Sequence, residues 1–249
     1  YGKRSILTSG LHGKIMSQLQ GFNVTEYGGI KPNPVCEDVD AAAALGKKHK
    51  VDMVLAAGGG SVIDSGKMIS ITIPVEHSAW QFMNCSQRPA KGLPLITVLT
   101  VAGTGSEMNS VAILQNHNTM QKNGYSHELL FPKESFLDPQ LTYTVPGNYT
   151  AFGMVDLISH ALEMYFGAGD APLPDKVVFS IIKEVQEIGP KLLNDLYNYE
   201  YRARIMYAAT LAFNGTTANC RKSGDWAVHG VGHVLSLLYD IPHGASLSI

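Results

Sequence analysis

The pattern of apolar residues changes once along this chain, close to Pro146. Before this point, short apolar runs alternate with glycine-rich turns and helical stretches, which is typical of a parallel sheet wrapped by helices. After it, apolar residues recur with the 3.6-residue period of α-helices. The sequence therefore predicts an α/β domain over residues 1–147 and an all-α domain over residues 148–249. We expect the arrangement to be incomplete at both ends, because the chain starts without Met in a turn and stops in an apolar stretch.

Individual elements follow from the same periodicities. Three strands are predicted, at residues 22–27, 51–57 and 93–99. The first half also contains helix patterns at residues 36–50 and 61–72. Helices in the second half are predicted at residues 149–166, 174–195, 200–219 and 224–239.

Composition narrows the class of protein. The 249 residues carry a net charge of -2 and only 19 Lys and Arg, so a nucleic-acid partner is not expected. No apolar run reaches the length of a membrane span. The 3 cysteines, Cys36, Cys85 and Cys220, are an odd number without close pairing, which argues against a disulfide framework. We therefore expect a cytoplasmic protein that acts on small molecules.

The helical half contains side chains that can bind one metal ion. Asp156 and His160 are four residues apart, so they share one face of a helix. His229 and His233 repeat this spacing, and His243 follows soon after. A single buried His is usually a core residue with one hydrogen bond, but five such groups together are costly to bury without a shared partner. They favour a divalent ion, and their chemistry does not choose between Fe(II), Zn(II) and similar metals.

Glycine-rich turns in the first half indicate a phosphate site. Gly58, Gly59, Gly60 and Ser61 connect a predicted strand directly to a helix, where free backbone N–H groups attract anions. The segment TVAGTGSE follows the next strand in the same way. Neither turn has the third glycine of the common dinucleotide fingerprint. Two such turns at successive strand ends nevertheless favour a nucleotide.

Taken together, these segments resemble the iron-containing, group III alcohol dehydrogenase family, and within it the butanol dehydrogenase and aldehyde reductase branch. The resemblance is carried, in chain order, by GGIKPNP, AAGGGSVIDSGK, TVAGTGSE, GMVDLISHALE and HGVGHVLSLLYDIPHG. It implies a dehydroquinate synthase-like architecture, a homodimer and hydride transfer between a nicotinamide cofactor and a small aldehyde or primary alcohol.

The resemblance also implies roles for particular residues. The implied metal ligands are Asp156, His160, His229 and His243, whereas helical spacing alone would choose His233 as the fourth ligand. His233 is instead expected to handle substrate or a proton. The cofactor-binding residues are expected to be Gly28, Gly29, Gly58, Gly59, Gly60, Ser61, Asp64, Thr100, Thr104, Ser106 and Lys122. Lys122 is equally compatible with a solvated lysine in a polar loop.

Gly28 bears on the choice between NAD and NADP. Members of the family that prefer NAD are expected to carry an aspartate there, because its carboxylate binds the ribose hydroxyl and repels a 2′-phosphate. Glycine removes that repulsion and Lys31 adds a positive charge, so NADP is favoured, while the nearby Glu26 leaves NAD possible.

The same residues are also compatible with other functions. A lyase related to dehydroquinate synthase, or a relative of glycerol dehydrogenase, would share the glycine turn and a metal site. A fragment that binds metal or dinucleotide without turnover is the third alternative.

Overall fold

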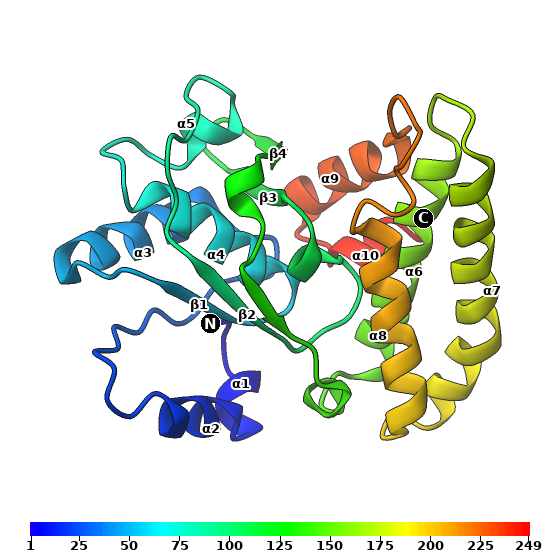
Figure 1. The fold of residues 1–249 in the computed structure, drawn as a ribbon, viewed down its shortest axis with the longest axis horizontal. Coiled ribbons are helices and arrows are strands. Elements are labelled where there is room, and N and C mark those ends of the chain that lie inside the picture. The colour runs from blue at the N-terminus through cyan, green and yellow to red at the C-terminus, as the bar shows by residue number, and fades with distance from the viewer. The chain divides into compact units, whose positions relative to one another are not determined.

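A computed structural model describes residues 1–249 and divides them into two compact units (Figure 1). Unit 1 contains Tyr1–Leu99 and Ser110–Phe136, and unit 2 contains Thr100–Asn109 and Leu137–Ile249. This division differs from the single boundary predicted at residue 147. The segment Thr100–Asn109 belongs with the helices, since the hydroxyl of Thr210 donates to the buried carboxylate of Glu107 over 2.6 Å.

Unit 1 is built on a parallel sheet with the strand order β1-β2-β5. Its strands are β1 (Val54–Gly58), β2 (Leu95–Leu99) and β5 (Glu134–Phe136). The predicted strands at residues 51–57 and 93–99 are thus confirmed, with later starts. The helices of this unit are α1 (Ser5–Thr8), α2 (Leu11–Gln18), α3 (Cys36–His49), α4 (Gly60–Thr72), α5 (Trp80–Met83) and the 3-10 turn η2 (Glu128–Leu130).

Helices α3 and α4 follow their sequence signals closely. Helix α3 has acids in its first turn and bases in its last, which complements the helix dipole, and it ends at Lys50 in the left-handed conformation. Helix α4 is buried along almost its whole length. Gly66 permits this close packing, because a Cβ there would lie 2.7 Å from the Cβ of Ala56 on β1.

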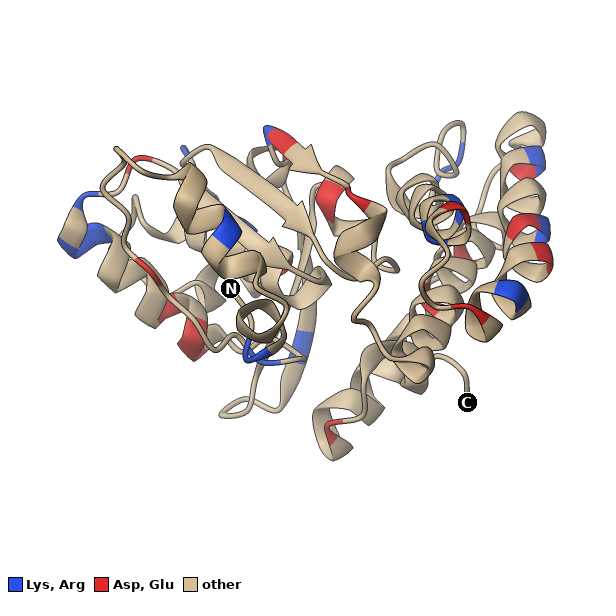
Figure 2. Ribbon diagram, turned by 90° about the horizontal axis from the view of Figure 1, so that it is seen from below, with Lys and Arg blue, Asp and Glu red and all other residues tan.

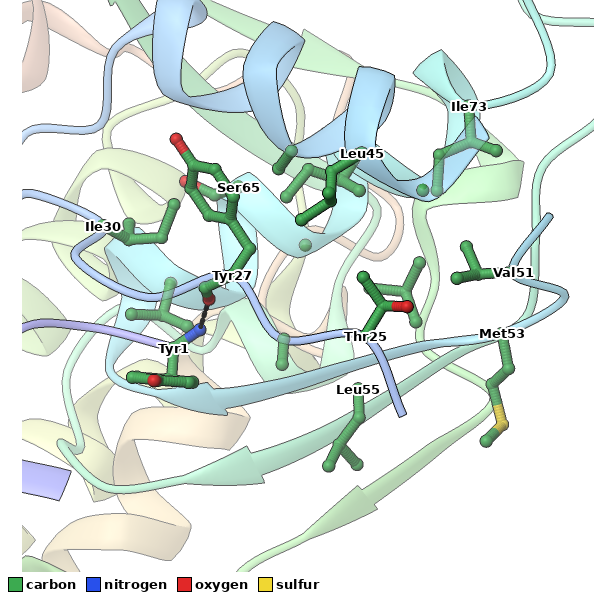
Figure 3. Close-up of a pocket in the computed structure, with 17 residues that line it drawn as sticks. Tyr1, Thr25, Tyr27, Ile30, Leu45, Val51, Met53, Leu55, Ser65 and Ile73 are labelled. Atoms are coloured by element: carbon green, nitrogen blue, oxygen red, sulfur yellow. Dashed lines mark hydrogen bonds between the residues drawn. The ribbon is translucent and has the colours of Figure 1, made fainter. Parts of the chain in front are cut away.

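The strand predicted at residues 22–27 is absent. The segment is extended, but it has no neighbouring strand, and β1 pairs only with β2. A cavity of about 110 Å³ lies there, lined by Thr25 and Tyr27 on one side and by Val54, Leu55 and Ala56 on the other (Figure 3). One edge of β1 therefore lacks a partner strand.

Unit 1 also contains an antiparallel hairpin that the sequence analysis missed. Strands β3 (Val111–Asn116) and β4 (Gln121–Ser126) pair along their full length. The polar sequence of β4 has no apolar alternation, which explains the omission. Two side chains of α4 fix the hairpin: the buried Asp64 carboxylate accepts from the N–H of Ile113 at 3.0 Å, and the Lys67 ammonium donates to the carbonyl of Val111 at 2.7 Å.

Unit 2 is helical, as predicted. Besides the 3-10 turns η1 (Ser106–Met108) and η3 (Pro139–Thr142), it contains α6 (Gly147–Tyr165), α7 (Pro172–Asn194), α8 (Tyr199–Phe213), α9 (Ala227–Tyr239) and α10 (His243–Ser246). Helices α6, α7 and α8 pack around a shared apolar core that includes Leu157, Ile188 and Ala209. Both acidic and basic residues occur along α7 (Figure 2). Helix α8 ends before the predicted residue 219, because Gly215 adopts a φ of 96°.

A contact between two backbones sets the position of the TVAGTGSE segment in unit 2. The Cα of Gly153, on α6, lies against this loop. A Cβ at Gly103 would be 3.0 Å from this Cα atom. A Cβ at Gly153 would lie 2.2 Å from the carbonyl oxygen of Ala102. Gly153 is therefore required by close packing, although glycine is a poor residue for a helix interior.

We expect Gly153→Ala to destabilise the protein by about 2 kcal/mol, because the added methyl group would overlap the backbone of Ala102. Gly147→Ala is the matched control on the same helix: its Cβ would meet only the Leu196 side chain, at 3.8 Å. Urea unfolding of both variants would measure the difference. Equal stability of the two variants would contradict the close approach.

Candidate metal centre

Helix α6 supplies one side of the candidate metal centre. Asp156, His160 and Glu163 occupy positions on the same face of this helix, and all three are buried. The helical spacing of Asp156 and His160 thus has the predicted effect. The Nδ1 atom of His160 lies 3.5 Å from the Oδ1 atom of Asp156.

The short segment from α9 to α10 supplies the other side. Gly232 lies three residues after His229, and a Cβ there would be 2.8 Å from the Leu247 side chain near α10. Gly244 follows His243, and a Cβ there would be 2.2 Å from the carbonyl oxygen of Phe152 on α6. Gly232 of HGVGH and Gly244 of PHG therefore let α10 approach α9 and α6, and this brings His243 to Asp156.

Three imidazole nitrogens surround one oxygen of Asp156. The Oδ1 atom lies 3.5 Å from His160 Nδ1, 3.6 Å from His229 Nε2 and 3.5 Å from His243 Nε2. Two ligand atoms in a tetrahedral site, each about 2.1 Å from the ion, lie roughly 3.4 Å apart. These separations match those expected for ligands of one divalent ion.

The atoms that face each other lack ordinary partners. Asp156 Oδ1, His160 Nδ1 and His229 Nε2 are buried and form no hydrogen bond. Buried polar atoms normally have such a bond, so their pairing must come from another source. A cation that accepts lone pairs from all of them satisfies this requirement, and the donor set of imidazole and carboxylate suits Fe(II) or Zn(II).

The predicted ligands are not equally placed. Asp156, His229 and His243 each offer a ligand atom within 4.8 Å of the other two. His160 lies next to this triad, with its ring stacked 4.3 Å from Phe213 and 4.5 Å from His229. His233 is outside the triad, and its ring centre lies 6.1 Å from that of His229. The geometry therefore groups His243 with Asp156, in contrast to the choice of His233 from helical spacing alone.

Burial and neighbouring charges shift the pKa values of this cluster in opposite directions. Burial acts to raise the pKa of Asp156, but the adjacent imidazoles of His160, His243 and His229 outweigh it and lower the pKa. Burial lowers the pKa of His160 to about 4. It acts in the same direction on His229, but the carboxylates of Asp156 and Glu163 raise the pKa of that residue to about 9.

Glu163 is a site residue that the sequence analysis missed. Its buried carboxylate accepts from the backbone N–H of His229 at 2.9 Å and pairs with Nδ1 of the same ring. The signal was present, because Glu163 follows His160 by three residues and lies on the same helical face. Burial acts to raise its pKa, but the bonds with His229 outweigh burial and lower it.

In unit 1, the turn after β1 has the geometry of an anion site. Strand β1 ends at Gly58 and α4 begins at Gly60, so the first N–H groups of a thirteen-residue helix follow the turn directly. A Cβ at Gly58 would lie 2.5 Å from the Val62 side chain. Asp64, in the next turn of the helix, is engaged with the β3–β4 hairpin.

The other cofactor candidates of unit 1 also take part in structural contacts. A Cβ at Gly28 would lie 2.5 Å from the ring of Tyr1, so a larger residue there would have to displace this side chain. Gly29 has a φ of 94°. Lys122 lies in β4 and not in a loop, and its ammonium group donates to Asn33 at 2.8 Å.

Thr100, Thr104 and Ser106 belong to unit 2. The Thr104 hydroxyl accepts from the N–H of Ser106 at 3.2 Å, and Ser106 is buried. Gly105 of the same turn has a φ of 61°, and a Cβ there would be 3.1 Å from the carbonyl of Ala209. Both glycines of TVAGTGSE, Gly103 and Gly105, thus have packing reasons that do not involve a nucleotide.

The chain also shows clear similarity to proteins of known family. It is 44% identical to the probable NADH-dependent butanol dehydrogenase 1 of Bacillus subtilis and 35% identical to the NADPH-dependent aldehyde reductase YqhD of Escherichia coli. Each alignment covers 100% of this chain and 65% of the relative, so the chain spans less than two thirds of their length. A solved NADH-dependent butanol dehydrogenase A from Thermotoga maritima matches with 39% identity and a TM-score of 0.97, over 100% of this chain and 63% of that one.

Family models account for almost the whole chain. The model of iron-containing alcohol dehydrogenase matches residues 1–139, and the model of the C-terminal part of this family matches residues 150–249. Together with the solved relatives, these matches confirm the predicted fold class, an α/β domain and an all-α domain. The chain belongs to the iron-containing alcohol dehydrogenase family.

Proposed function

We propose that this chain is the part of an oxidoreductase that transfers a hydride between a nicotinamide dinucleotide and a small aldehyde or primary alcohol. The observation that carries this proposal is the triad of Asp156, His229 and His243, whose ligand atoms all lie within 4.8 Å of one another, with His160 Nδ1 3.5 Å from Asp156 Oδ1. The proposed ligands are Asp156, His160, His229 and His243. A bound Fe(II) or Zn(II) would act as a Lewis acid on the carbonyl oxygen of the substrate.

Residues around this group would control the proton that the reaction needs. Reduction of an aldehyde places negative charge on its oxygen, which must then receive a proton. His233 is only partly buried, and its ring centre lies 5.5 Å from that of His243. We assign His233 the role of moving a proton to this oxygen, while Asp156 balances the positive charge of the site.

The turn from Gly58 to Ser61 is the proposed site for the pyrophosphate of the cofactor. Its backbone N–H groups and the helix dipole of α4 favour a negatively charged group. Gly28, Gly29, Asp64 and Lys122 are proposed to support this part of the cofactor site from unit 1. For Asp64 and Lys122 this role is indirect, through the contacts with the hairpin and with Asn33. Thr100, Thr104 and Ser106 are proposed to contact the cofactor as well.

The preference for NADP is proposed from charge. No carboxylate stands at Gly28, and Gly29 donates to the carbonyl oxygen of Gly2 at 3.0 Å. Lys3 and Arg4, which follow Gly2, are exposed. These two cations suit a 2′-phosphate better than a free hydroxyl. Similar proteins include both NADH-dependent butanol dehydrogenases and an NADPH-dependent aldehyde reductase, so the two cofactors must be compared directly.

The test of the activity is the oxidation of NADPH and NADH by anaerobically Fe(II)-loaded protein that is offered butanal. We expect turnover with NADPH in excess of turnover with NADH, measured as loss of the reduced cofactor's absorbance. A dehydroquinate synthase-like lyase would give no net cofactor oxidation. Absence of turnover with metal and cofactor both bound would contradict the proposed reaction and favour the fragment without turnover.

We expect His229→Ala to lose metal binding, because it removes a buried ligand atom 3.6 Å from Asp156 Oδ1. Metal content after dialysis would measure this loss, together with the rise in melting temperature on adding Zn(II). At a metal concentration 100 times the Kd, binding stabilises the wild-type protein by about 2.7 kcal/mol. His233→Ala is the matched control on the same helix, and it should retain the metal. Metal retention by His229→Ala would exclude His229 as a ligand.

We expect Lys3→Ala combined with Arg4→Ala to weaken NADPH binding by about tenfold or more, with little change for NADH. A charge-assisted hydrogen bond contributes about 1.5–3 kcal/mol, and 1.4 kcal/mol corresponds to tenfold in affinity. Fluorescence titration would give both dissociation constants. The control is Lys48→Ala combined with Lys91→Ala, which removes two exposed charges from the same unit. Equal loss in both double variants would show only a general effect of net charge.

A further inference from the structure

The charge of Glu163, like that of Asp156, is compensated by imidazole and not by Lys or Arg. Glu163 is 2% exposed and its ion-pair partner is His229, whereas Glu184 and Asp175 pair with arginines. Burial of a carboxylate is costly, and at Glu163 the bonds with His229 outweigh this cost. The position of Glu163 therefore requires a reason connected with His229.

Both oxygens of the Glu163 side chain bind the same residue. Oε1 accepts from the backbone N–H of His229 at 2.9 Å, and Oε2 pairs with Nδ1 of its ring. The backbone of Glu163 is engaged too, since its carbonyl accepts from the N–H of Asp225 at 2.9 Å. These contacts fix the first turn of α9 and the rotation of the His229 ring together.

The chemistry of the two groups then determines which nitrogen is free to bind a metal. An ionised carboxylate can only accept hydrogen bonds, so the proton between the two groups belongs on Nδ1. The lone pair of the neutral ring is then on Nε2. This is the atom that lies 3.6 Å from Asp156 Oδ1, inside the candidate metal centre.

We propose that Glu163 is a positioning residue that holds His229 in the Nδ1–H tautomer and aims Nε2 at the metal. Carboxylates that accept from the second nitrogen of a metal-binding imidazole act in this way, and their loss typically weakens metal affinity by about 10–100-fold. This inference rests on the proposed metal site, but it concerns a residue that does not touch the ion.

The test compares Co(II) binding to wild-type protein, Glu163→Gln and Glu184→Gln. The glutamine at position 163 keeps the size of the side chain, but it can accept from or donate to Nδ1, so it no longer selects one tautomer. Affinity would be measured by competition with a chelator, and the ligand field by the visible absorption of bound Co(II). We expect Glu163→Gln to bind Co(II) about 10–100-fold more weakly with an altered spectrum. Glu184→Gln, which removes a carboxylate paired with Arg204, should behave as wild type.

A second measurement does not depend on the folding of a variant. Nitrogen NMR of histidine-labelled wild-type protein with Zn(II) should show His229 protonated at Nδ1 and metal-bound at Nε2. Unchanged Co(II) affinity and spectrum in Glu163→Gln, or the opposite tautomer in the wild type, would overturn the role of Glu163 and leave the metal site intact. Failure of the wild-type protein to bind Co(II) would overturn the metal site and this role together.

Discussion

The burial of Asp156 among three imidazoles is the constraint on which the rest of unit 2 depends. A carboxylate at this depth loses its hydration, and the imidazoles of His160, His243 and His229 outweigh this loss and hold its pKa below the usual value. The cluster is stable only if α6, α9 and α10 hold their atoms at fixed separations. Gly232 and Gly244 make this possible, because any side chain at these positions would separate the helices. Gly232 and Gly244 thus allow the close packing that positions His229 and His243.

His229 is held from two sides, and this explains its unusual acid–base behaviour. Asp156 lies on one side of the ring and Glu163 on the other, and both carboxylates favour the protonated form. His160, by contrast, is packed against Phe213 and favours the neutral form. The two imidazoles, 4.5 Å apart, therefore have pKa values shifted in opposite directions: burial dominates at His160, whereas the two carboxylates outweigh burial at His229.

The sequence predicted the elements whose signals are local. Helix α3 has charges at both ends that complement its dipole, and the spacing of Asp156 and His160 fixes their common face. The prediction of a strand at residues 22–27 was wrong, because a strand needs a neighbouring strand to pair with and the periodicity of apolar residues does not reveal one. The β3–β4 hairpin was missed because β4 is polar. The candidate metal ligands were predicted from chemistry and family resemblance, but the packing that brings His243 to Asp156 depends on α10.

The unpaired edge of β1 has a consequence for what unit 1 can bind. Main-chain N–H and C=O groups along an unpaired edge are a template for pairing with another chain. The apolar lining of the adjacent cavity would let an incoming strand bury its side chains as well as form main-chain hydrogen bonds. This edge carries few of the charges and prolines that usually prevent such pairing. Within residues 1–249, this edge of β1 is therefore where a further strand can pair, through hydrogen bonds that do not depend on the sequence of that strand.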